Sequence, residues 1–540
     1  MTKNQTEEYD AVVLGAGFSG LYMLHRLREA GFSARVYEAA EDVGGVWYWN
    51  RYPGARCDVQ SIYYNYSFSE ELFNEWTWSS KFPEQPEILR YLNFVADKFD
   101  LRKDIQFITR ITSAHYDEIN NNWKINLSDG STVLTKYFIS GVGCLSAANI
   151  PNFKGLDTFQ GDWYHTGHWP KEKVEMKNKR VGVIGNGSSG IQAIPVIAKE
   201  AGHLTVFQRT PQYTVPARNH TYKPEFIKKT KQNYAEIYKD MRETEIGQKI
   251  QVSNVSALSD TAEKRKEVFQ KAWEEGGYAF STTYYDIMIN EEANNMAADF
   301  IRSKIKEIVR DPKVAEKLLP NYLYGTKRTV MDTDYYETYN RENVTLVDVK
   351  QAPIVEITPT GIRTSEAEYD LDIIVFATGY DGMTGPLFKF DIRGKNGVSL
   401  KEKWEDGANV RTFLGLTTAG FPNFFMITGP ESPSVLVNML SAIEQHVEWI
   451  SDCLEYLRNK GVETIEPTVE AEEKWSEHCR EVAEQTLYVK TDSWYTGANI
   501  AGKPRSFLIY LGGFPGYKQR CNEVASSGYN GFTVSSLNTL

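Results

Sequence analysis

The stretch Gly15-Ala16-Gly17-Phe18-Ser19-Gly20 follows a short apolar run, Tyr9–Leu14, and precedes an amphipathic one, Leu21–Ala30. This order predicts a strand, a tight turn and a helix, which is the arrangement that binds a dinucleotide. Gly15 permits the turn, Gly17 lets the backbone approach a pyrophosphate, and Gly20 allows the helix to pack closely on the strand. The unpaired N–H groups of the helix N-terminus would then face the phosphates.

This first site has an acidic residue at the position that binds a ribose. The next expected strand, Ala34–Tyr37, ends at Glu38, and a carboxylate at this spacing accepts hydrogen bonds from a ribose 2′-hydroxyl. Because a carboxylate repels a 2′-phosphate, we expect FAD or NAD here and not NADP. A surface helix over 82–100 and alternating strands over 105–137 would complete the first unit.

A second fingerprint, Gly185-Asn186-Gly187-Ser188-Ser189-Gly190, follows an expected strand over 180–184 and opens a helix. The strand after it, His203–Gln208, ends at Arg209 rather than at an acid. A guanidinium there can pair bidentately with a 2′-phosphate, so this site should prefer NADPH; the alternative is a surface arginine at a strand end. The residues expected in this site are Gly185, Gly187, Ser188, Gly190, Arg209 and Thr210.

Two further segments of the chain are rich in aromatic residues. Phe159–Pro170, read FQGDWYHTGHWP, lies between the fingerprints, and its polar His165 and Thr166 among aromatic residues suit a hinge packed between two domains. Residues 44–58 combine Gly44-Gly45 with dense aromatics, which suggests backbone lying close to a flat ring system. For both segments the alternative is core packing without chemistry.

The middle of the chain predicts a helical insertion. Residues 223–319 are rich in Lys, Glu and Ala, and Ala297, Ile301, Ile305 and Ile308 fall on one helical face. We expect the charged residues of this segment to form a solvated surface.

The last third returns to strands. A strand over 369–380 contains Ala377-Thr378-Gly379, and a buried strand over 421–429 precedes a long helix. The Gly-rich stretch 493–505 has an exposed-looking Trp494. It predicts either a mobile loop that closes over nucleotide and substrate or a plain surface loop.

Both aromatic-rich segments resemble motifs of one enzyme family. The pattern F-x-G-x-x-x-H-T-x-x-W-P is matched by Phe159, Gly161, His165, Thr166, Trp169 and Pro170. The pattern G-G-x-W-x-x-x-x-Y-P-G-x-x-x-D is matched by Gly44, Gly45, Trp47, Tyr52, Pro53, Gly54 and Asp58. Both patterns are similar to fingerprints of the Baeyer–Villiger monooxygenases, and the order of the parts agrees over essentially the whole chain.

This resemblance implies an α/β fold with two interleaved Rossmann-like dinucleotide-binding domains, one for FAD and one for NADPH, and a helical insertion. The FAD-binding domain would comprise residues 1–144 and 381–540. The NADPH-binding domain would comprise residues 145–215 and 325–380, with the insertion over 216–324.

The resemblance also assigns roles by position. Arg328, which ends the segment Tyr324-Gly325-Thr326-Lys327-Arg328, takes the place of the active-site arginine, and Asp58 that of the aspartate beside the flavin. The cofactors would contact Gly15, Gly17, Gly20, Glu38, Gly45, Trp47, Asp58, Lys327, Arg328 and Trp494. The substrate would contact Cys57, Val59, Leu145, Ser434, Val435, Leu436 and Met439. The segment 431–440 is similar to the phenylacetone and steroid types, whereas Cys144 stands where some relatives have a larger polar residue.

The implied reaction is an oxygen insertion beside a ketone carbonyl. NADPH would reduce FAD, the reduced flavin would take O₂ to a C4a-peroxide, and attack on the ketone would give an ester or lactone. A flavin N- or S-hydroxylase shares both nucleotide folds and is the closest alternative. A disulfide reductase would need a redox cysteine pair, and a flavin-binding interaction protein would only signal through its redox state.

Composition restricts the partners. A chain of 540 residues exceeds what one core supports, and its net charge of −11 argues against nucleic acid or an anionic membrane as partner. The polar start MTKNQTEEYD lacks a signal-peptide core, and the five cysteines contain no C-x-x-C. We expect a cytoplasmic, metal-free monomer, with a weak homo-oligomer as the alternative, that acts on a ketone and O₂.

Overall fold

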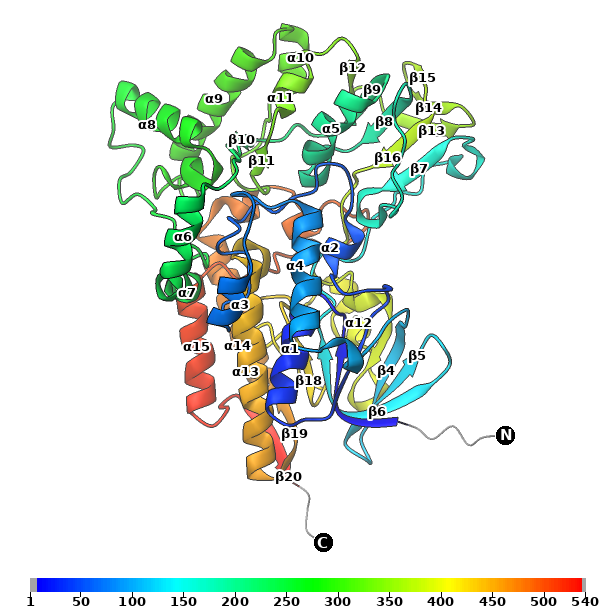
Figure 1. Ribbon diagram of the computed structural model, residues 1–540, viewed down its shortest axis with the longest axis vertical. Coiled ribbons are helices and arrows are strands. Elements are labelled where there is room, and N and C mark those ends of the chain that lie inside the picture. The colour runs from blue at the N-terminus through cyan, green and yellow to red at the C-terminus, as the bar shows by residue number, and fades with distance from the viewer. Residues whose placement is uncertain (1–6, 537–540) are drawn as a thin grey trace.

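The computed structural model describes residues 7–536, so the first six residues of the polar start lie outside it. Two α/β units are stacked along the long axis, with the first unit below the second in Figure 1. The chain enters the first unit, crosses to the second and returns. The predicted α/β class with two interleaved dinucleotide folds is therefore confirmed.

The first unit is organised on an eight-stranded mixed sheet with the order β17-β4-β5-β6-β1-β2-β3, in which β18 also pairs with β6. Its strands are β1 (Glu7–Leu14), β2 (Ala34–Tyr37), β3 (Ile105–Gln106), β4 (Ile111–Asp117), β5 (Asn122–Leu127), β6 (Thr132–Ser140), β17 (Asp391–Arg393) and β18 (Phe424–Met426). Its helices are α1 (Phe18–Glu29), α2 (Val46–Trp49), α3 (Glu70–Glu75), α4 (Gln85–Lys98), α12 (Leu400–Lys403), α13 (Met439–Lys460), α14 (Val469–Glu484) and α15 (Phe514–Ser526). A separate two-stranded antiparallel sheet of β19 (Val462–Pro467) and β20 (Phe532–Ser536) completes the unit.

The second unit is organised on a five-stranded, all-parallel sheet with the order β12-β9-β8-β16-β7. Its strands are β7 (Asp162–His165), β8 (Arg180–Ile184), β9 (His203–Gln208), β12 (Val344–Asp348) and β16 (Ile373–Phe376). Two small sheets consist of β10 (Thr214–Pro216) with β11 (Val330–Asp332), and of β13 (Ile354–Thr358), β14 (Gly361–Thr364) and β15 (Glu368–Asp370). Helices α5 (Ser188–Glu200) and α11 (Tyr335–Thr338) accompany the sheets.

The two fingerprints occupy equivalent places in the two sheets. Strand β1 lies between β2 and β6, and β8 lies between β9 and β16, so each glycine-rich loop leaves its sheet where the strand order reverses. The neighbouring residues Val12 and Val13 are both fully buried, although successive residues of a strand face opposite sides. The same is true of Ile374 and Val375. Both sheets are therefore covered on both faces, as the apolar runs of the sequence require.

Tight packing explains the third glycine of each fingerprint. A Cβ on Gly20 would lie 1.7 Å from the carbonyl oxygen of Gly15, and one on Gly190 would lie 2.5 Å from that of Gly185. Each helix can start this close to its strand only because a side chain is missing.

The helical insertion contains α6 (Pro224–Gln232), α7 (Tyr234–Glu243), α8 (Ala262–Glu275), α9 (Glu291–Ile308) and α10 (Pro312–Lys317). Ala297, Ile301 and Ile305 of α9 are fully buried in the core of the second unit. Ile237 and Met241 of α7 belong instead to the core of the first unit. The insertion thus divides its packing between the two units, which the boundary drawn at residues 216–324 does not capture.

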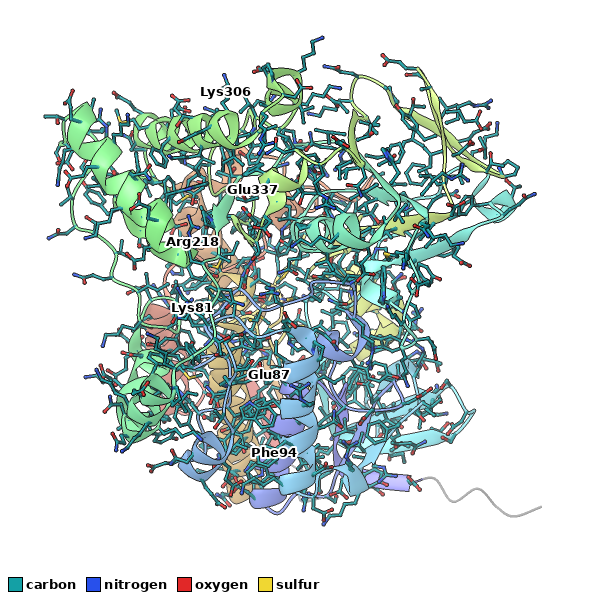
Figure 2. The ribbon with its side chains drawn as sticks, turned by 45° about the horizontal axis from the view of Figure 1, so that its top comes forward. Lys81, Glu87, Phe94, Arg218, Lys306 and Glu337 are labelled. Carbon is teal, nitrogen blue, oxygen red and sulfur yellow. The ribbon has the colours of Figure 1, made fainter. Side chains whose placement is uncertain are left out.

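Backbone contacts between residues 80–81 and residues 220–221, just before the insertion, also join the two units. Lys81 of the first unit donates its N–H to the carbonyl oxygen of His220 at 3.0 Å, and Ser80 and Thr221 form an antiparallel bridge. Figure 2 labels Lys81 and Arg218 near these contacts, between Glu87 and Phe94 of α4 below and Lys306 and Glu337 above. Among residues 7–536, no helix has both the length and the apolar character needed to span a bilayer.

The segment predicted as a hinge has a more specific structure. Residues Asp162–His165 form β7, the edge strand of the second sheet, which pairs in parallel with β16. The 3-10 turn Thr166–His168 then leads to Trp169, whose ring packs in the core of the second unit. Its backbone N–H donates to the carbonyl oxygen of Trp49 in the first unit at 3.3 Å. The segment is therefore part of one sheet and a contact to the other unit, not a free linker.

We predict that Gly161→Ala destabilises this edge. A Cβ there would lie 2.4 Å from the carbonyl oxygen of Asp372, and such overpacking costs about 1 to 3 kcal/mol. The matched control is Gly516→Ala in α15, where a Cβ would meet no atom within 4 Å. Because alanine favours the helix more than glycine does, this change should raise the free energy of unfolding by about 0.5 to 1 kcal/mol. Thermal unfolding scans should show a lower midpoint for the first variant only, and equal midpoints would contradict this reading.

Candidate active site

An ion pair joins the two units at the centre of the molecule. Arg328 donates from Nε to Asp58 Oδ2 at 2.7 Å and from Nη2 to Asp58 Oδ1 at 2.9 Å. Asp58 lies in the first unit and Arg328 follows the insertion of the second, 270 residues later. The two side chains keep 25% and 26% of their surface exposed, so they form a wall of a space rather than an interior contact.

Both partners of this pair stay charged. Burial raises the pKa of Asp58, but the charge and hydrogen bonds of Arg328 outweigh burial and hold that pKa below its ordinary value. Burial lowers the pKa of Arg328, and the Asp58 carboxylate more than reverses this and raises it well above the ordinary value. The site therefore presents a fixed, oriented positive charge at any working pH.

A third bond connects Arg328 to the predicted substrate segment. Its Nη1 donates to the carbonyl oxygen of Val435 at 2.8 Å, in the 3-10 turn Ser434–Leu436. Ser434 is fully buried in the left-handed region, with φ 41°. Of the predicted pocket residues, Leu145, Val435, Leu436 and Met439 pack in one hydrophobic cluster with Cys144, and Cys57, Val59 and again Met439 pack in the neighbouring one. Met439, at the start of α13, therefore connects the two halves of the wall.

The first fingerprint faces the glycine pair of the aromatic segment. A Cβ on Gly45, whose φ is 55°, would lie 3.0 Å from the Cα of Gly17. Glu38 accepts the N–H of Ala16 and of Ala40, both at 2.7 Å, and so holds the loop beside Gly17. Burial raises the pKa of Glu38, and these backbone donors oppose the shift. Trp47 donates from Nε1 to the hydroxyl of Tyr64 at 3.0 Å, which fixes its ring.

The second fingerprint opens towards a group of positive charges. Burial lowers the pKa of Lys327, and the nearby charges of Arg209 and Lys350 lower it further. Arg209 is exposed at the end of β9, and Lys327 lies over the ring of Tyr322 at 4.8 Å. The opposing charge of Asp492 only partly offsets these like charges, and such a group favours the binding of an anion.

The aromatic segment also fastens one unit to the other. Tyr52 donates to Gln192 Oε1 at 2.7 Å, and Gln192 Nε2 donates to the carbonyl oxygen of Arg56 at 3.1 Å. A Cβ on Gly54 would lie 2.4 Å from the carbonyl oxygen of Gln192. Helix α5 of the second unit therefore packs directly on the backbone that carries Asp58.

The hinge motif, Phe159–Pro170, also contributes to the contact between the two units. His165 accepts the N–H of Gly167 at Nδ1 at 2.9 Å, and burial, followed by the charge of His168, lowers its pKa to about 4. It is thus neutral and shapes a turn. Phe159 and Trp169 pack in two different clusters of the second unit.

The prediction for Trp494 needs a correction. It was expected to be exposed, but it is half-buried, packs beside Tyr495 with ring centroids 4.4 Å apart, and belongs to the cluster that holds Leu145. Composition could not reveal this, because the stretch is Gly-rich and the indole packs beside Gly382, which lies far away in the sequence.

Sequence reasoning missed two aromatic residues beside the ion pair. Burial raises the pKa of Tyr278 and of Tyr495, and both phenols also interact with the charge of Arg328. Tyr278 follows Gly276-Gly277, whose φ values are 73° and 64°, so this glycine pair was the available signal. Tyr495 carried no comparable signal.

The residues present fit two bound dinucleotides. Helices α1 and α5 both begin at a fingerprint glycine without a side-chain cap or an acidic residue in the first turn, so their N-terminal N–H groups can receive phosphates. A Cβ on Gly187 would meet no atom within 4 Å, so the second fingerprint borders open space. All five cysteines are free and buried, which leaves no exposed thiol pair for a disulfide reductase.

Comparisons with known proteins agree with this geometry. A family model described as flavin-binding monooxygenase-like matches residues 9–222. A Baeyer–Villiger monooxygenase of Pseudooceanicola batsensis is 46% identical over 98% of this chain and 96% of its own. Oxidized steroid monooxygenase bound to NADP is 50% identical with a TM-score of 0.93, and the closed crystal structure of cyclohexanone monooxygenase is 45% identical with a TM-score of 0.96. Each structure covers 98% of this chain and 100% of its own.

Fold and comparisons together define a flavoprotein oxidoreductase with two dinucleotide-binding domains. More narrowly, the chain belongs to the Baeyer–Villiger monooxygenases. It is an FAD- and NADPH-dependent enzyme that inserts one oxygen atom of O₂ beside a ketone carbonyl to give an ester or lactone.

We predict that Arg209→Ala raises the KM for NADPH about tenfold to a hundredfold and leaves that for NADH nearly unchanged. Loss of a charge-assisted contact costs about 1.5 to 3 kcal/mol, and only NADPH carries the 2′-phosphate. Steady-state kinetics with both nucleotides measure this. Arg180→Ala is the control, because Arg180 starts β8 at the opposite end from the fingerprint. Equal losses with both nucleotides would show that Arg209 supports the fold instead.

Proposed function

We propose that Arg328 is the catalytic residue of the oxygen insertion and that Asp58 positions it. The observation that carries the proposal is the two-point Arg328–Asp58 bond, with the third N–H group bound to Val435 in the predicted pocket wall. Bound FAD would supply hydride acceptance and O₂ activation, and NADPH would supply the hydride. Arg328 would stabilise negative charge on the attacking oxygen and on the carbonyl oxygen of the ketone adduct.

The other residues bind, orient and exclude water. Glu38 and the first fingerprint would hold FAD, with Gly45 and Trp47 beside its ring. Arg209, Thr210 and Lys327 would bind the 2′-phosphate of NADPH. Tyr278 and Tyr495, with pKa values raised by burial, would keep the surroundings of Arg328 apolar and neutral.

We further propose that the substrates are aryl-substituted or bulky aliphatic ketones. The support is the pocket wall of Leu145, Leu436 and Met439, all half-buried, and the similarity to the steroid enzyme. Cys144 adds a small side chain to this wall, and burial raises its pKa, so the thiol stays neutral. We also propose a monomer in the cytoplasm, consistent with five buried free cysteines and a net charge of −11.

The test separates reduction from oxygenation. We predict that Arg328→Ala is still reduced by NADPH without O₂ but makes little ester, because loss of one preorganised charge stabiliser costs on the order of 3 to 4 kcal/mol, a hundredfold to a thousandfold in rate. Asp58→Ala should show a milder form, and Arg328→Lys should fall between, because lysine keeps the charge but not the two-point bond. Stopped-flow absorbance follows reduction, and mass spectrometry measures the ester from a ketone panel.

Two results would contradict the assignment. Normal ester yield from Arg328→Ala would remove Arg328 from the oxygenation step. Failure of anaerobic reduction would place it in the other half-reaction.

We predict that Met439→Ala extends the range of ketones to larger ones, with a change in relative kcat/KM of about one order of magnitude. Met439 lies where the two clusters of the wall meet, so its removal should enlarge the pocket. Met296→Ala is the control, because Met296 packs at the edge of the core of the second unit. An unchanged profile over ketones of several sizes would place Met439 outside the pocket.

A further inference from the structure

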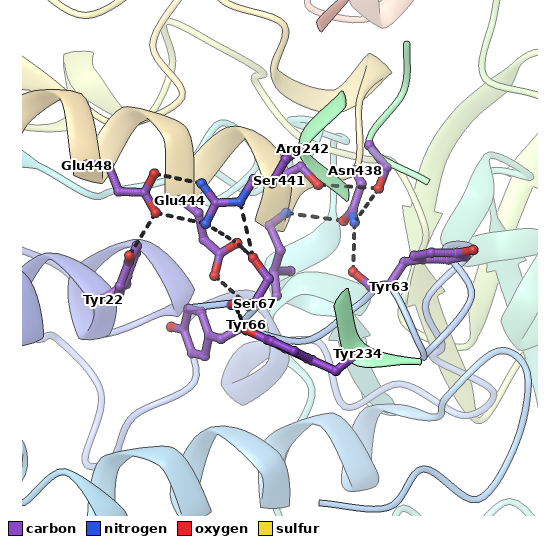
Figure 3. Close-up of polar contacts among 12 residues, drawn as sticks. Tyr22, Tyr63, Tyr66, Ser67, Tyr234, Arg242, Asn438, Ser441, Glu444 and Glu448 are labelled. Carbon is purple, nitrogen blue, oxygen red and sulfur yellow. Dashed lines mark hydrogen bonds and ion pairs between the residues drawn. The ribbon is translucent and has the colours of Figure 1, made fainter. Parts of the chain in front are cut away.

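Helix α7 of the insertion is fastened to helix α13 of the first unit. Figure 3 shows the polar contacts between them, with Arg242 of α7 facing Glu444 and Glu448 of α13. Arg242 donates to Glu448 Oε2 at 2.6 Å and Oε1 at 2.8 Å, and to Glu444 Oε2 at 3.1 Å. Arg242 is 4% exposed and Glu444 is fully buried.

The remaining acceptors of this group are also bound. Ser67 donates its N–H to Glu444 Oε1 at 2.7 Å and its hydroxyl to Oε2 at 2.5 Å, and Tyr22 donates to Glu448 Oε1 at 2.9 Å. Burial raises the pKa of Glu444, and the Arg242 charge opposes that shift. A buried charge pair with its hydrogen bonds complete is costly to break, so α7 moves with α13 and the first unit.

One residue extends this attachment to the end of α13 that borders the ketone pocket. Asn438, 2% exposed, caps α13 by accepting the N–H of Leu440 at 3.2 Å. Its amide nitrogen donates to the carbonyl oxygens of Tyr63 at 2.7 Å and of Gly247 at 3.1 Å. Its own N–H donates to the carbonyl oxygen of Ile246 at 2.8 Å.

The approach of the chain after α7 is close. A Cβ on Gly247, whose φ is 68°, would lie 2.6 Å from Ser441 Oγ and 3.0 Å from the Cβ of Asn438. The loop after α7 can therefore reach Asn438 only because residue 247 is glycine.

These bonds join the loop after α7 to two segments that carry the site. Tyr63 lies five residues after Asp58, and Asn438 lies three residues after Val435, whose carbonyl oxygen binds Arg328. Met439, at the meeting of the two wall clusters, is the next residue. The side chain of Asn438 thus sets the distance between the Asp58 side and the Val435 side of the pocket.

We infer that Asn438 is a positioning residue for ketone binding, held in place by the loop after α7. The inference rests on the proposed pocket, since it requires that Val435 and Met439 face the ketone. It also divides the insertion: α7 is attached to the first unit through α13, whereas α9 packs in the core of the second unit.

The test uses the holoenzyme with Asn438→Ser. Serine is as good an N-cap as asparagine, so the cap remains, but its hydroxyl is too short to replace both amide bonds. The matched control is Asn290→Ser, at the cap of α9, where Asn290 accepts the N–H of Ala293 at 3.1 Å on the NADPH side. A second variant, Asn438→Asp, keeps the helix cap. It replaces the amide nitrogen by a carboxylate oxygen, which cannot donate to the carbonyl oxygens of Tyr63 and Gly247.

In Asn438→Ser we expect the ketone KM to rise about threefold to tenfold, with kcat and the rate of anaerobic reduction by NADPH nearly unchanged. Less ester should form for each NADPH consumed, and Asn438→Asp should show larger changes. Hydrogen exchange should become faster in residues 244–248 and 434–442. The control should keep its ketone KM and its ester yield.

A wild-type KM and ester yield in Asn438→Ser would overturn the inference, as would equal changes in the control. If the wild-type enzyme makes no ester from any ketone, the proposed function fails instead. Hydrogen exchange then decides the attachment alone, and unchanged exchange in both segments would overturn it.

Discussion

The bidentate bond between Arg328 and Asp58 is the interaction on which the rest of the molecule depends, because each partner comes from a different unit. Removal of one partner would leave the other charge without its counter-ion in a partly buried site, so the pair favours the docked arrangement. The docking surfaces are built for it: α5 packs on Gly54 with no room for a Cβ, and Gln192 bonds to both Tyr52 and the backbone of Arg56. A fixed positive charge is thereby carried by the same contact that holds the units together.

The two nucleotide folds share a local geometry and differ in charge. In both, the third glycine of the fingerprint packs against the carbonyl oxygen of the first, and both helices begin without a side-chain cap. At the end of the following strand, one unit has the buried Glu38 and the other has the exposed Arg209 with Lys327 nearby. The two units therefore share one backbone arrangement and differ in the charge at the end of the following strand.

The insertion shows how a segment can belong to both units. Its apolar faces pack on different cores, with Met241 in the first and Ile301 in the second, and the Arg242 group lies wholly on the side of the first. The insertion is therefore attached to both units, with α7 on the first and α9 on the second.

The sequence by itself determined both fingerprints and the strands that precede them, because glycine spacing and apolar runs act locally along the chain. The nucleotide preference of each site stays a prediction that rests on Glu38 and Arg209. Strands β2, β8 and β9 have the predicted bounds, and the buried face of α9 follows from helical spacing. Only the tertiary structure decided which unit α7 joins, that Trp494 is half-buried and that 162–165 is an edge strand. The same holds for Tyr278, Tyr495 and Asn438, whose partners lie far away in the chain. Local patterns specify backbone conformation, whereas burial and long-range hydrogen bonds depend on which surfaces meet after folding.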